Sequence, residues 1–213
     1  LVSVASAGTL SCSQSQTGSA IVSVISLPTA TISGSTTICS GGTATVTFTG
    51  TPNAVVTYTV DSGANQTVTL DASGNASITT STLTSDSVYA LVNVALTGTA
   101  SCSQAQTGSA TITIAPLPTA AISGSTSVCP NSTAVISFTG TPNATITYTV
   151  DSGANQTITL DAAGNATVTT PTLNTDSTYT LVSVMASGTL ACSQSQTGSA
   201  TVTVVPLPTA TIA

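Results

Sequence analysis

The sequence predicts an all-β protein built from tandem β-sandwiches that are joined end to end as a rod. Three observations lead to this prediction: a 90-residue internal repeat, short segments in which apolar and polar residues alternate, and turn sequences rich in Gly, Asn, Asp and Pro between those segments. No segment shows the 3.6-residue apolar periodicity of an amphipathic helix. About seven short strands per repeat are typical of immunoglobulin-like or fibronectin-III-like sandwiches.

The repeat sets the expected domain boundaries. The string LPTA begins at Leu27, Leu117 and Leu207, and TGTPNAVVTYTVDSGANQTVTLDASGN from Thr49 recurs as TGTPNATITYTVDSGANQTITLDAAGN from Thr139. Because the first residues match the end of a repeat and the last match its start, we expect a parent polymer that continues in both directions. The predicted division is the last strands of a preceding repeat (1–26), two complete repeats (27–116 and 117–206), and the first strand of a following repeat (207–213).

Each strand is predicted from strict alternation. In TATVTFTG, Ala44, Val46 and Phe48 share one face while threonines occupy the other, so the apolar face should pack into a core. The same pattern marks VVTYTV, QTVTL, NASITT and SATITI. Apolar residues make up 40% of the chain but aromatics only 3%, which predicts a thin aliphatic core. Tyr89, six residues after Leu83, has the position of the tyrosine corner of such sandwiches, whose hydroxyl bonds nearby backbone.

The connections between repeats favour a stiff rod. The last strand of one repeat continues through Pro-Leu-Pro directly into the next repeat, in the segments TITIAPLPTA and TVTVVPLPTA. Proline fixes φ, and a segment this short leaves little freedom to swivel.

The charge balance excludes several classes of function. The chain has six acidic residues, all Asp, and no Lys, Arg or His, which gives a net charge of −6. Phosphate neutralisation by a nucleic-acid-binding protein needs cations, and acid–base catalysis most often uses His, Lys or Glu. The composition therefore predicts a protein that is not an enzyme, binds no nucleic acid and inserts no segment of this sequence into a membrane. No cofactor is expected, because most of the aspartates begin turns rather than cluster as calcium ligands.

Five cysteines occupy two positions of the repeat: Cys39 and Cys129 before the second strand, and Cys12, Cys102 and Cys192 near the last hairpin. Regular placement without a CxxC motif or His favours disulfides in an oxidising compartment over metal ligation. Two pairings stay open. The first lies within a repeat and joins Cys39 to Cys102 and Cys129 to Cys192. The second joins Cys39 to Cys192 of the following repeat, because the last hairpin and the second strand lie at opposite ends of a sandwich and a disulfide needs Cα atoms under ~7 Å apart.

The segments PLPTATISG, ICSGGTATVTFTGTPN and CSQSQTGSATVTV resemble tandem immunoglobulin-like repeats of giant Bacteroidota cell-surface proteins, gliding adhesins among them. The resemblance covers essentially the whole sequence and implies export by the type 9 secretion system. It also implies O-glycosylation at Asp followed by Ser or Thr and then an apolar residue or Thr. Asp86-Ser87-Val88 and Asp176-Ser177-Thr178 match that signal, so Ser87 and Ser177 are glycosylation candidates.

Three functions compete at this point. The leading hypothesis is a structural stalk or spacer of an extracellular filament or cell-surface adhesin. Its partners would be neighbouring repeats of the same chain and laterally associated chains. The alternatives are an adhesive or glycan-binding module, and an ice-binding surface formed by the threonine arrays. All three place the protein outside the cell.

Overall fold

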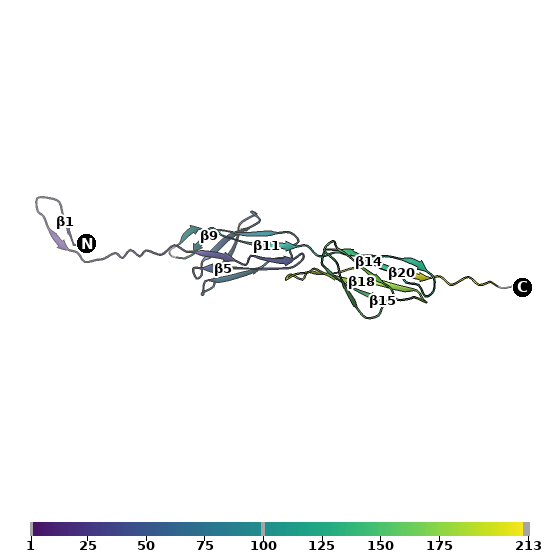
Figure 1. The fold of residues 1–213 in the computed structure, drawn as a ribbon. Coiled ribbons are helices and arrows are strands. Elements are labelled where there is room, and N and C mark those ends of the chain that lie inside the picture. Colours follow the sequence, from purple (N-terminus) through teal and green to yellow (C-terminus); the bar gives the residue numbers. More distant parts are fainter. Residues whose placement is uncertain (1, 99–100, 211–213) are drawn as a thin grey trace.

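The computed structural model describes residues 2–98 and 101–210, and every regular element among them is a β-strand. No helix long and apolar enough to cross a membrane occurs in this part of the chain. Two sandwiches follow one another along a line, with a small hairpin before the first and an extended segment after the second (Figure 1). This arrangement confirms the predicted all-β fold of tandem sandwiches.

The first sandwich packs a three-stranded sheet against a six-stranded sheet. The three-stranded sheet has the order β3-β5-β8, and the larger sheet has the order β4-β11-β9-β6-β7, with β10 also paired to β9. Its strands are β3 (Ala30–Ser33), β4 (Thr36–Cys39), β5 (Thr45–Gly50), β6 (Val55–Val60), β7 (Gln66–Thr69), β8 (Asn75–Thr79), β9 (Ser87–Leu96), β10 (Cys102–Ala105) and β11 (Ser109–Ala115).

The second sandwich repeats this topology. Its sheets have the orders β12-β14-β17 and β13-β20-β18-β15-β16, with β19 paired to β18. Its strands are β12 (Ala120–Ser123), β13 (Thr126–Val128), β14 (Val135–Gly140), β15 (Thr145–Val150), β16 (Gln156–Thr159), β17 (Asn165–Thr169), β18 (Ser177–Met185), β19 (Ser193–Ser195) and β20 (Ser199–Val204).

The alternating residues form the core as the sequence predicts. Val46 and Phe48 on β5 are fully buried, as are Val56 on β6 and Ile112 on β11. The few aromatic rings pack together at the centre of each sandwich, where the rings of Phe48 and Tyr58 are tilted by 42° with their centroids 5.1 Å apart. Each repeat has its own core cluster.

Each repeat contains more strands than the seven expected, because two long strands are interrupted at glycines. Gly34 has φ of 114° and separates β3 from β4, which then join different sheets. A Cβ at this position would lie 2.5 Å from the carbonyl oxygen of Thr45, so only glycine fits. Gly108, with φ of 142°, lies between β10 and β11, which both pair with β9 in the same sheet.

The tyrosine corner is only partly present. Tyr89 is buried and stacks on Tyr58 at a centroid distance of 6.4 Å. Among the described residues, however, neither its hydroxyl nor that of Tyr179 donates a hydrogen bond to the backbone. The spacing from Leu83 therefore predicts the position of the ring, but the hydrogen bond that defines the corner is absent.

The hairpin before the first sandwich has the register of the last hairpin of each complete repeat. It joins β1 (Ser3–Ala5) to β2 (Ser13–Ser15), pairing Ser3 with Ser15, as β18 and β19 pair Ser183 with Ser195. The residues at the other end of the chain, 205–210, form no strand. The predicted first strand of a following repeat, 207–213, lies partly outside the described residues.

Candidate functional site at the junction between the repeats

The junction is the part of the molecule where the two repeats meet, and a four-residue linker, 116–119, spans it between β11 and β12. Pro118 is buried and Leu117 is half-buried. The equivalent Leu27 and Leu207, which have no such neighbour on one side, are 58% and 67% exposed. The same residue type at the same repeat position therefore loses solvent contact where two sandwiches adjoin, which shows that the junction is packed.

A hairpin of the second sandwich reaches back across the linker toward the first. It consists of the end of β18, residues 186–192 and β19, and it extends beyond the body of its own sandwich (Figure 1). Cys192 lies just before β19 and is only 2% exposed. Its sulfur is bonded to that of Cys39, at the end of β4 in the first sandwich, with the two Cα atoms 5.6 Å apart. A covalent bond thus joins the two repeats beside the linker.

The parallel pairing of β4 with β11 explains why Cys39 lies at the junction. The pairing places Cys39 opposite Ala115, the last strand residue before the linker. The chain then turns sharply, because Gly41 has φ of 82° and its N–H donates to the carbonyl oxygen of Leu83. The amide of Ser40 donates to the carbonyl oxygen of Ala115 at 2.9 Å. These bonds hold Cys39 at the point where the chain leaves the first sandwich.

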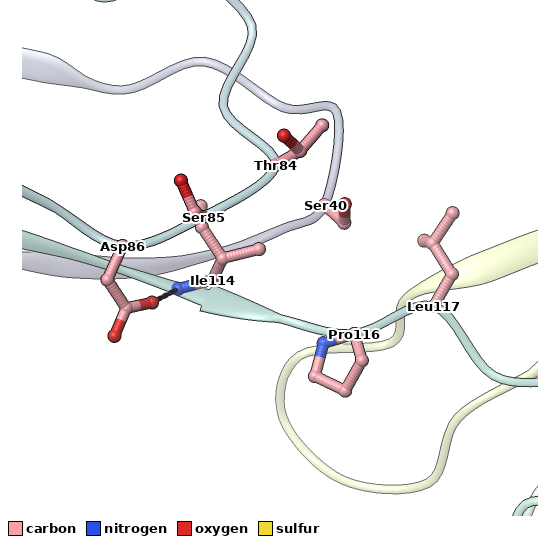
Figure 2. A pocket seen from close by; sticks show the side chains of 7 residues that line it. All are labelled: Ser40, Thr84, Ser85, Asp86, Ile114, Pro116 and Leu117. Atoms are coloured by element: carbon pink, nitrogen blue, oxygen red, sulfur yellow. Dashed lines mark hydrogen bonds between the residues drawn. The ribbon is translucent and has the colours of Figure 1, made fainter.

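A shallow cleft beside the linker shows how the neighbouring loop is fixed. Figure 2 shows its lining residues, Ser40, Thr84, Ser85, Asp86, Ile114, Pro116 and Leu117. Asp86 accepts a hydrogen bond from the amide of Ile114 at 2.7 Å, which ties the loop before β9 to the end of β11. In the second repeat, Asp176 accepts the same bond from Val204.

The structure decides between the two cysteine pairings. Cys39 bonds to Cys192 of the following repeat, so the alternative pairings within a repeat, Cys39 to Cys102 and Cys129 to Cys192, are both wrong. The physical reason is the one used in the sequence argument: β4 ends at one end of its sandwich, and the last hairpin turns at the other. The remaining candidates, Cys12, Cys102 and Cys129, are free thiols in this structure.

The two glycosylation candidates have structural roles. Ser87 is 2% exposed, and its hydroxyl donates to Asp61 at 3.0 Å. Ser177 is buried in the same way and donates to Asp151. Both hydroxyls are therefore buried and hydrogen-bonded in the folded sandwich, and glycosylation of these serines stays a prediction.

The aspartates bind backbone rather than one another. Asp61 accepts from the amide of Val88 at 2.7 Å, and Asp71 accepts from the amides of Ser73 and Asn75. No group of three or more potential metal ligands occurs among residues 2–98 and 101–210. Only Asp71 and its equivalent Asp161 bond the backbone of their own turn, as the sequence predicts. Asp61 and Asp86 instead bond the backbone of strands distant in the sequence, so the turn role predicted for them is wrong.

Buried tyrosines are the groups whose protonation the fold alters. Burial raises the pKa of Tyr58, and the neighbouring Tyr89 raises it further. Burial also raises the pKa of Tyr148 and Tyr179. In each repeat the central tyrosine hydroxyl donates to a glutamine side chain, as Tyr58 does to Gln66 at 3.0 Å.

Sequence reasoning missed the part that Leu117 plays. The Pro-Leu-Pro string was interpreted only as a stiff connection, although an apolar residue between two prolines is itself a signal for a packed contact. The sequence also does not predict how far the last hairpin of the second repeat extends toward the first. The pairing of its strands can be inferred from the pattern, but the direction in which it projects cannot.

No known protein family and no curated protein matches this sequence. Among solved structures, the chain is similar to a marsupial T cell receptor, with a TM-score of 0.50 and 13% identity over 87% of this chain and 75% of that one. A human OSCAR ligand-binding domain matches at a TM-score of 0.38 and 12% identity, over 82% of this chain and 97% of that one. The first likeness shows an immunoglobulin-like fold, and it shows the fold alone.

Proposed function

We propose that this chain is a structural spacer, a stiff segment of an extracellular filament or of the stalk of a cell-surface adhesin. The observation that carries the proposal is the bond between Cys39 and Cys192, which joins two sandwiches across a four-residue linker that already contains two prolines. A binding module gains nothing from such a bond, whereas a rod gains resistance to bending and to extension.

The position of the bond routes mechanical force around both cores. A pull on the two ends passes along the chain to Cys39, across the disulfide and out from Cys192, so the loop that the bond closes, with a sequence separation of 153, carries no load through its backbone. The aromatic clusters of both cores lie inside this loop, with Phe48 against Tyr58 in the first sandwich and Phe138 against Tyr148 in the second. Most of the two hydrophobic cores therefore cannot be extended while the bond is intact.

A location outside the cell follows from the same bond, because disulfides persist in oxidising compartments. The absence of Lys and Arg removes every cleavage site for trypsin-like proteases, which suits a long-lived surface structure. The resemblance to Bacteroidota surface repeats supports a cell-surface stalk exported by the type 9 system.

The aromatic residues favour the spacer over a glycan-binding module. Sugar sites commonly use exposed aromatic rings as stacking platforms, but all six aromatic residues of this chain are buried. The threonine faces likewise favour a spacer over an ice-binding surface. One of the hydroxyls of Thr31 and Thr49 donates to the other at 2.7 Å, so part of their hydrogen-bonding capacity is used within the protein.

Single-molecule pulling on the two ends of the chain tests the spacer function. The three free cysteines are first replaced by serine, so that thiols cannot exchange with the bond. We expect that the loop closed by the disulfide, with a sequence separation of 153, does not extend under force in the oxidised chain. Reduction should then add about 500 Å of contour length at ~3.4 Å per residue. The matched control is Cys39→Ser, which should release that length without reductant. Full extension of the oxidised chain would overturn the proposal.

A further inference from the structure

We infer that Cys129 and Cys102 each form a disulfide with a further copy of this repeat. Cys129 would play the part of Cys39 and Cys102 the part of Cys192, in the same kind of disulfide-bonded junction, here called the joint. The occupant of each end is thus a sandwich of the same kind, and every unit would be bonded to the unit before it and to the unit after it. This inference rests on the proposed spacer function and names the partner that continues the rod.

Cys129 has the local structure of Cys39. It follows β13, which pairs in parallel with β20 as β4 pairs with β11, and Val128 lies opposite Val204 just as Ile38 lies opposite Ile114. The turn after it is closed by an isolated bridge between Ser132 and Leu173, the equivalent of the bridge between Gly42 and Leu83. The thiol of Cys129 is exposed.

Cys102 has the local structure of Cys192. Val94 pairs with Gln104 as Val184 pairs with Gln194, so the hairpin that carries Cys102 has the register of the hairpin that crosses the junction. The Cys102 sulfur already lies 4.0 Å from the carbonyl oxygen of Ser26, in the segment that leads into the first sandwich. Cys102 therefore lies beside the segment that precedes the first sandwich, where the counterpart of Cys39 in a preceding repeat would be.

Both cysteines, and the leucines of the adjoining Pro-Leu-Pro segments, are more exposed than their counterparts at the junction between the two sandwiches. Leu117 is half-buried at the filled junction, whereas Leu27 and Leu207 at the two outer positions remain largely exposed. Cys192 is 2% exposed in its bond, while Cys102 and Cys129 both retain solvent contact. A further sandwich at each end would cover the leucine and the thiol together, as the central junction does.

The chemistry needs an oxidant, which we take to be a small disulfide or a disulfide-exchange protein of the oxidising compartment. One cysteine thiolate attacks the oxidant to form a mixed disulfide and releases one thiol from it. The second cysteine thiolate then displaces the remaining thiol of the oxidant and forms the bond between the repeats. Two cysteine thiols lose two electrons and two protons, and the oxidant disulfide becomes two thiols.

The test extends the full chain after Pro206 by one further copy of residues 117–206. The chain has five cysteines, one disulfide and three free thiols, and the added copy brings two more cysteines. If the joint forms, the oxidised extended chain still has three free thiols by mass after alkylation under denaturing conditions. If it does not form, the count rises to five, and the inference is wrong.

Peptide mapping then identifies the partner. Pepsin at low pH is suitable, because the chain offers trypsin no site and acid suppresses thiol exchange. We expect Cys129 joined to the added counterpart of Cys192, and Cys129→Ser should leave that counterpart free. Placing a copy of residues 27–116 ahead of Leu27, in place of 1–26, should likewise join Cys102 to the added counterpart of Cys39.

The outcomes separate the two proposals. An intact Cys39–Cys192 bond with a free Cys129 would refute the repeating joint and leave the spacer standing. Loss of the Cys39–Cys192 bond itself in the oxidised chain would remove the basis of both.

Discussion

The Cα atoms of Cys39 and Cys192 lie 5.6 Å apart although the two residues are 153 positions apart in the sequence. The contact depends on four things at once: the parallel pairing of β4 with β11, the short linker, the reach of the last hairpin, and the end-to-end placement of the sandwiches.

Removal of the disulfide should loosen the junction. We expect Cys192→Ser to leave each sandwich folded but to widen the range of angles between them, so that the maximum dimension of the chain in small-angle X-ray scattering decreases. A loop of this length gives the bond up to about 5 kcal/mol of stabilisation through the unfolded state, which should also lower the melting temperature. Cys102→Ser is the matched control and should change neither quantity, because that thiol is free in the chain.

Leu117 should stabilise the junction by apolar contact. Truncation by Leu117→Ala removes part of a half-buried side chain and should cost about 1 kcal/mol. The control is Leu207→Ala, at the same repeat position but 67% exposed, which should be neutral. Both are best measured by thermal melting in a Cys39→Ser background, where the disulfide does not mask the contact. Equal effects of the two substitutions would contradict a packed junction.

The division of the first long strand should depend on Gly34. Gly34→Ala combines a positive φ with a Cβ placed 2.5 Å from the carbonyl oxygen of Thr45, so we expect a loss of at least ~2 kcal/mol in chemical denaturation. Gly41→Ala is the control, because it also has a positive φ but meets no atom within 4 Å. It should show only the smaller cost of the backbone conformation. A Gly34→Ala chain as stable as the Gly41→Ala chain would show that the backbone can move away from the clash.

Asp61 should hold the start of β9 in place. Its carboxylate accepts from the amide of Val88 and the buried hydroxyl of Ser87, so Asp61→Ala leaves a buried donor without a partner. We expect a loss of about 2 to 3 kcal/mol in the free energy of unfolding. Asp71→Ala, which removes an exposed turn contact, should cost less. Urea unfolding of the two variants side by side would reveal whether this order is reversed.

The stability should fall at alkaline pH because of the buried tyrosines. Their folded pKa values are raised above the unfolded value, so the folded state binds their protons more tightly. That stabilisation is fully present below pH ~10 and is lost as the pH rises through the folded pKa values. Melting temperatures measured with blocked thiols should therefore decline above pH ~10. The decline should be smaller in a chain carrying Tyr58→Phe, Tyr148→Phe and Tyr179→Phe, and an unchanged decline would assign it to other groups.

Local pattern determined the sandwich interior. Alternation in the strand that carries Val46 and Phe48 specifies which side chains point inward, because successive residues of a strand face opposite sides. The 90-residue spacing of LPTA likewise specifies how often that unit recurs. These features need only neighbouring residues, so they can be inferred without knowing where distant segments lie.

Only the tertiary structure decided which cysteines meet and what the aspartate-flanked serines do. Cys39 had two partners that the sequence could not separate fully, and the choice of Cys192 depends on how one sandwich is placed against the next. Ser87 matched a modification signal in the sequence, yet its hydroxyl is buried against Asp61, 26 residues away in the chain. The physical reason is common to both: contacts between segments far apart in sequence arise from the relative placement of strands and sandwiches, and local residue patterns do not encode that placement.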